Sequence, residues 1–99
     1  MRFERRWKTR WNGHDIEVVN WWNVLLMCGE RLFIDGKIVD DAKGWLSISR
    51  ELKGTVTSGG TAYVIRAHIG SVDRGLRVGC LIYADDKVIG GDISKSFVT

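Results

Sequence analysis

Residues 30–41 read Glu30-Arg-Leu-Phe-Ile-Asp-Gly-Lys-Ile-Val-Asp-Asp41, and this stretch decides the fold. Two short apolar runs flank the dipeptide Asp35-Gly36, which is the strongest short-range signal for a β-hairpin. A two-residue type I′ turn needs positive φ at both central positions; Asp tolerates this conformation, and Gly has no Cβ to oppose it. We therefore expect a hairpin in which Arg31 faces Asp40, so that opposite charges lie across the ladder.

The same pattern returns fifty positions later. Residues 82–89 (Ile-Tyr-Ala-Asp-Asp-Lys-Val-Ile) match residues 32–39 (Leu-Phe-Ile-Asp-Gly-Lys-Ile-Val) position by position. Residues 14–19, 63–69 and 76–84 alternate apolar and polar side chains, which is the period of half-buried strands. Turn signals separate these runs, and no stretch shows a helical period. We expect a polar loop over Asp40 to Gly44, a break at Gly54 and a final edge strand over Ile93 to Val98. The sequence predicts an all-β fold, an antiparallel β-sandwich or flattened barrel of about seven to eight short strands with two related hairpins.

Composition indicates one domain, residues 1–99. A chain of 99 residues with 44% hydrophobic content can bury a single core. Cys28 and Cys80 lie far apart and form no CxxC motif, so we expect neither a disulfide framework nor a zinc module. The longest apolar run, Val18 to Cys28, falls short of the roughly 20 residues of a membrane span, and no signal-peptide pattern is present. We expect a cytoplasmic protein with reduced thiols and no membrane contact.

Positive charge is concentrated at the start of the chain. Five of the first ten residues are basic and one is acidic, a net of +4 (5 − 1) in a chain whose total is +3. Four of these cations share one face of a predicted strand: Arg2, Arg6, Lys8 and Arg10. A second hairpin, turning at Asn12-Gly13, is expected to bring Asp15 and Glu17 beside this basic row.

The basic row suggests nucleic-acid binding as an alternative function. Cations hold a nucleic-acid backbone by charge, and aromatic side chains stack on bases. Period two, however, places Phe3, Trp7 and Trp11 on the face opposite the cations, so one strand cannot present both on one surface. We therefore expect the tryptophans of this strand to pack in the core and the cations to form a solvated face.

Trp21-Trp22 is the main candidate for a protein contact. If this segment is extended, its two side chains point to opposite faces and one indole leaves the core face; an irregular loop would let both fold inward. An outward Trp is enriched at protein contacts. We expect an irregular connection over Val24 to Met27, and we name Trp21, Trp22 and Leu25 as candidate partner-binding residues, with a homodimer as one form of the contact.

No arrangement typical of catalysis is recognisable. Four side chains are the only soft metal ligands, and they lack the usual short ligand spacings: His14, His68, Cys28 and Cys80. The pairs Asp40-Asp41 and Asp85-Asp86 fall at predicted turns, where Asp is favoured for local hydrogen bonding. No nucleophile, base and orienting group appear together. We predict a non-enzymatic protein without catalytic residues, metal, cofactor or small-molecule substrate.

Three segments resemble a known family. They are residues 13–17 (Gly-His-Asp-Ile-Glu), residues 29–37 (Gly-Glu-Arg-Leu-Phe-Ile-Asp-Gly-Lys), and Trp45 followed by residues 52–54 (Leu-Lys-Gly). This pattern is similar to that of the Fas apoptosis inhibitory molecule family, and the resemblance covers roughly Trp11 to Gly54. It implies a non-catalytic β-sandwich that acts through protein contacts, with roles in protecting cells and restraining protein aggregation. We therefore expect a protein-interaction module that can self-associate.

Overall fold

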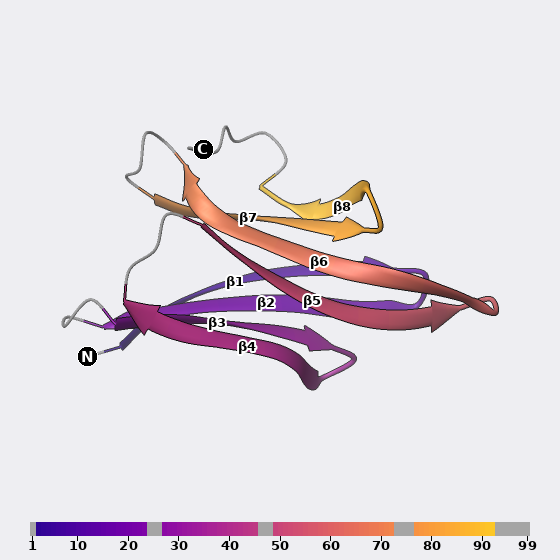
Figure 1. The fold of residues 1–99 in the computed structure, drawn as a ribbon, viewed down its shortest axis with the longest axis horizontal. Coiled ribbons are helices and arrows are strands. Elements are labelled where there is room, and N and C mark those ends of the chain that lie inside the picture. Colours follow the sequence, from indigo (N-terminus) through magenta and orange to yellow (C-terminus); the bar gives the residue numbers. More distant parts are fainter. Residues whose placement is uncertain (1, 24–26, 46–48, 73–76, 93–99) are drawn as a thin grey trace.

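The computed structural model describes residues 2–23, 27–45, 49–72 and 77–92, and within these ranges the chain is all strand and turn (Figure 1). The strands, in chain order, are β1 (Arg2–Trp11), β2 (His14–Asn23), β3 (Met27–Ile34), β4 (Lys37–Trp45), β5 (Ser49–Ser58), β6 (Thr61–Val72), β7 (Arg77–Ala84) and β8 (Lys87–Gly91). They form two four-stranded antiparallel sheets, sheet A with the order β1-β2-β3-β4 and sheet B with the order β5-β6-β7-β8. The predicted all-β sandwich is confirmed.

The core lies between the two sheets. The inward side chains of every second residue along the central strands are buried, as the period of the sequence predicts. Both sheets contribute to the core cluster, which consists of Trp7, Ile16, Val18, Leu32, Ile34, Leu52, Val56, Ile65, Ala67, Ile69, Cys80, Ile82 and Ala84. We call the face of each sheet that carries these residues its inner face and the opposite face its outer face.

Edge strands of the two sheets meet along two seams, which gives the sandwich the character of a flattened barrel. At the seam between β1 and β8, Thr9 Oγ1 donates a hydrogen bond of 3.1 Å to the Ile89 carbonyl. At the seam between β4 and β5, the Lys53 backbone N–H donates to Asp40 Oδ2 over 2.8 Å. Side chains rather than a continuous backbone ladder therefore bridge these contacts.

The two related hairpins have the same construction. Asp35 and Asp85 both have positive φ, 53° and 52°. The Asp35 N–H donates to the Asp15 carbonyl, and Asp35 Oδ1 accepts the Asp15 N–H. Asp85 makes the same two bonds with Val64 on β6. Each turn thus uses one aspartate to hold the adjacent strand, and the predicted relationship between the hairpins is confirmed.

The predicted pairing of Arg31 with Asp40 is wrong by one residue. A β-bulge follows the Phe33↔Ile38 pair, so that Leu32 lies opposite Asp40 and Arg31 opposite Asp41. Arg31 Nε lies 3.8 Å from Asp41 Oδ1, which keeps opposite charges across the ladder in a shifted register. The second hairpin has its irregularity at the corresponding place, between Ile82 and Tyr83.

Two predicted interruptions are also absent. The segment Asp40 to Gly44, expected as a polar loop, is part of β4, and Gly54, expected as a break, lies inside β5. A Cβ on Gly54 would lie 2.7 Å from Val39 Cγ2, so glycine at this position permits β4 and β5 to approach. The irregular connection expected over Val24 to Met27 is wrong at Met27, which begins β3. Residues 24–26 of that connection and the edge strand expected at residues 93–98 lie outside the described residues.

Candidate functional site

The Trp21-Trp22 pair lies on an extended strand. Because β2 continues to Asn23, the two side chains point to opposite faces, and the loop alternative is excluded. Trp22 lies opposite Phe3 on β1 and Cys28 on β3, whereas Trp21 lies opposite Gly29. The third candidate partner-binding residue, Leu25, lies outside the described residues.

Phe3 and Trp22 form a stacked pair on the inner-face side of sheet A, at the end remote from the Asn12-Gly13 turn. Their ring centroids are 5.7 Å apart and their planes differ by 21°. Phe3 is 40% exposed and Trp22 is partly buried, while Cys28, opposite Trp22 in the sheet, is buried. The core therefore ends in an aromatic pair that solvent reaches.

Trp21 covers the outer face of sheet A. A Cβ on Gly29 would lie 2.5 Å from Trp21 Nε1, so the indole occupies the space that a side chain at Gly29 would need. Glu4 lies opposite Trp21 on β1. The Trp21 indole can therefore lie against the sheet surface because Gly29 has no side chain.

The basic row lies on the same outer face, as predicted. Arg6, Lys8 and Arg10 are exposed, whereas Trp7 belongs to the core. Of the fourth candidate cation, Arg2, the structure describes only the backbone, which lies opposite Asn23. The expectation that aromatic side chains of β1 and the cations occupy opposite faces is confirmed for Trp7.

The expected carboxylates lie beside the cations. Arg6 Nη1 and Lys8 Nζ each lie 3.4 Å from a carboxylate oxygen of Glu17. Arg10 Nη1 lies 3.1 Å from Asp15 Oδ1. Part of the positive charge of β1 is therefore balanced within the sheet.

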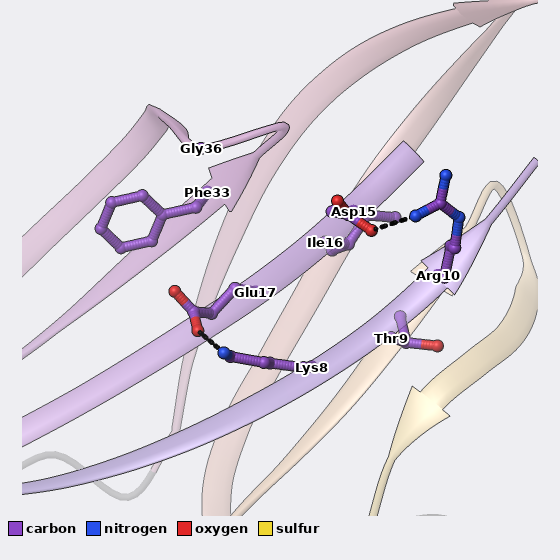
Figure 2. Close-up of a pocket in the computed structure, with 8 residues that line it drawn as sticks. All are labelled: Lys8, Thr9, Arg10, Asp15, Ile16, Glu17, Phe33 and Gly36. Carbon is purple, nitrogen blue, oxygen red and sulfur yellow. Dashed lines mark hydrogen bonds and ion pairs between the residues drawn. The ribbon is translucent and has the colours of Figure 1, made fainter. Parts of the chain in front are cut away.

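An open hollow of about 580 Å³ lies over this part of the outer face (Figure 2). Residues of β1, β2 and the β3–β4 hairpin line it: Lys8, Thr9, Arg10, Asp15, Ile16, Glu17, Phe33 and Gly36. Phe33 reaches this face from β3, two strands away from the cations. The alternation of β1 alone does not indicate Phe33, because this residue meets the cations only through the pairing Lys8↔Glu17↔Phe33 across the sheet.

His14 forms a short hydrogen bond with Asp35 at the turn end of the molecule. His14 Nδ1 and Asp35 Oδ2 are 2.7 Å apart. This hydrogen bond raises the pKa of His14, and the backbone of Thr57 on β5 also raises it. The same bond with His14, together with the Asp15 backbone, lowers the pKa of the Asp35 carboxyl. The pair thus joins β2 of sheet A to the β3–β4 turn and faces β5 of sheet B.

The two cysteines are free and buried. Burial raises the pKa of the Cys80 thiol, which keeps it a neutral apolar side chain. Within residues 2–23, 27–45, 49–72 and 77–92, no three His, Cys, Asp or Glu side chains are grouped so that they could hold a metal ion. The same part of the chain contains no helix able to cross a membrane.

Fold and surface together define a small antiparallel β-sandwich of two similar four-stranded sheets, with an exposed aromatic pair at one end and a basic, aromatic-lined hollow on one outer face. Comparison of the chain with protein-family models, curated proteins and solved structures finds no match. The function is therefore argued from the geometry of these two surfaces.

Proposed function

We propose that this protein is a non-catalytic protein-interaction module that self-associates through the Phe3–Trp22 pair. The observation that carries the proposal is the stack of two large aromatic rings, 5.7 Å apart, at a place where Phe3 remains 40% exposed. Tryptophan is one of the residue types enriched among the few positions that carry most of the binding energy at protein contacts. A second copy placing its own pair against this one would form a closed two-fold contact.

The stack is suited to binding because its geometry is already set. The two rings come from directly opposite positions on β1 and β2, so the sheet holds them together before a partner arrives. An offset-stacked aromatic pair adds about 0.5–1.5 kcal/mol beyond the area it buries. Binding through rings that are already ordered loses little side-chain entropy.

Two further observations support a non-catalytic role. The Cys80 thiol is buried and its pKa is raised, which opposes use as a nucleophile. His14 is engaged by Asp35 at the turn end, and no described residue pairs it with a hydroxyl or thiol nucleophile. The resemblance of residues 13–17, 29–37 and 52–54 to Fas apoptosis inhibitory molecule domains also supports action through protein contacts.

Light scattering of the full chain tests the proposal. We expect the mass of a dimer for the wild type and of a monomer for Trp22→Ala, with little effect of salt because the contact is apolar. Val64→Ala is the matched control, since Val64 is 42% exposed on the outer face of sheet B and should leave the mass unchanged. A monomeric wild type, or a Trp22→Ala protein that remains dimeric, would refute self-association at this site.

A further inference from the structure

We propose that the outer face of sheet A also binds single-stranded nucleic acid, with the phosphate backbone along β1 and a base against Phe33. The Phe3–Trp22 contact lies on the inner-face side of the sheet, so binding at the outer face is independent of it. Binding there rests on the hollow of Figure 2, where cations of β1 and the Phe33 ring line the same space.

The cations form a regular, projecting row. Arg6, Lys8 and Arg10 occupy alternate positions of one strand, so neighbouring members start about 7 Å apart. The side chain of Lys8 is 74% exposed, whereas that of its partner Glu17 is only 22% exposed. The Lys8 side chain therefore remains open to a ligand although its ammonium contacts the Glu17 carboxylate.

The aromatic element comes from the neighbouring strands. Lys8, Glu17 and Phe33 lie in one row across β1, β2 and β3, and Phe33 is the lining residue that β3 contributes (Figure 2). A base entering the hollow can rest on the Phe33 ring while its phosphates lie over β1, the combination of charge and stacking that single-strand binders use. β1 cannot present aromatic and basic side chains on one face, but Phe33 of β3 supplies an aromatic ring on the face that carries the cations.

The carboxylates of Asp15 and Glu17 compete with a phosphate for the cations of β1. Glu17 binds both Arg6 and Lys8, and Asp15 binds Arg10, so a phosphate must take these cations from carboxylates. Removing the charge of Glu17 should therefore increase affinity. A loss of folding cannot produce such a gain, which makes Glu17→Gln the most informative variant.

The experiment is fluorescence anisotropy of a labelled single-stranded oligothymidylate with the full chain. Three phosphate contacts predict that affinity falls about twenty-fold between about 50 and 200 mM salt. We expect Lys8→Glu with Arg10→Glu to abolish binding and Glu17→Gln to tighten it. Lys53→Glu is the matched control, because Lys53 is an exposed lysine of β5 in the other sheet and should change affinity much less.

Phe33→Ala tests the base site and should weaken binding about ten-fold. Phe33→Leu keeps an apolar side chain for packing but removes the stacking ring, so it should weaken binding to a similar extent. Absence of binding at low salt, or weaker binding by Glu17→Gln, would overturn the proposal. Wild-type affinity in both Phe33 variants would overturn the base site. Displacement by polyglutamate as effective as by unlabelled oligothymidylate would show that the face recognises acidic protein instead, which would also overturn the proposal.

Discussion

At the scale of single residues, the His14–Asp35 pair shows how one hydrogen bond couples folding to pH. The pKa of His14 lies above its ordinary 6.5 because the imidazolium donates to Asp35. Its contribution to stability is therefore complete below pH 6.5 and is lost as pH rises through the folded pKa. The pKa of Asp35 lies below its ordinary 3.8, so its contribution is present above that pH and is lost as pH falls through the folded pKa.

The pair should therefore stabilise the protein most between pH 3.8 and 6.5. We predict that His14→Gln lowers the urea midpoint in this window and that the difference from wild type shrinks as pH rises through the folded pKa of His14. Urea titrations of both proteins over a pH series measure this, and an NMR titration of the His14 ring gives the pKa directly. A difference that stays constant with pH would contradict the assignment.

Individual residues were predictable where the pattern is local. The turn at Asp35-Gly36 and its equivalent at Asp85 follow from conformations that Asp and Gly tolerate, and the burial of Trp7 follows from period two. The register beyond Phe33 was not predictable in the same way. The turn residues fix the pairing only next to the turn, and in both hairpins a bulge after the second residue pair shifts the register.

At the scale of elements, Asp92 is the residue that ties the end of β8 to β1. Its Oδ2 accepts hydrogen bonds from Trp7 Nε1 at 2.9 Å and from the Cys80 backbone N–H at 3.0 Å. Its Oδ1 lies 3.6 Å from Arg5 Nη2. One carboxylate thus joins a strand of sheet A to sheet B. The position of Asp92 directly after Gly90-Gly91 does not predict this role.

We predict that Asp92→Ala destabilises the fold by about 2–4 kcal/mol, because the N–H groups of Trp7 and Cys80 lose their acceptor in a largely buried place. Asp92→Asn retains one acceptor oxygen for both donors and loses only the charge opposite Arg5, so it should cost about 1 kcal/mol or less. Denaturant unfolding of the three proteins measures the difference. Equal stability of Asp92→Ala and Asp92→Asn would show that the carboxylate does not hold the seam.

At the scale of the whole molecule, two similar four-stranded sheets close over one core and leave different surfaces. The fold class was predictable because alternation and turn signals recur through both halves. The candidate surfaces were predictable only in part. The sequence indicates Trp22 and the cations of β1, but Phe3 lies beside Trp22, and Phe33 beside the cations, only because of the pairing between strands. Pairing between strands is a property of the folded sheet that a single strand does not encode.

The proposed self-association brings two copies together at the Phe3–Trp22 end, so a distance measured between copies is its sharpest test. Spin labels on Glu4→Cys, an exposed site beside Phe3, should show strong dipolar coupling between protomers, because Cys28 and Cys80 are buried and remain unlabelled. Labels on Thr61→Cys, at the β5–β6 turn, should be much farther apart in a molecule 44 Å long. Weak or absent coupling at Glu4→Cys with strong coupling at Thr61→Cys would contradict the claim.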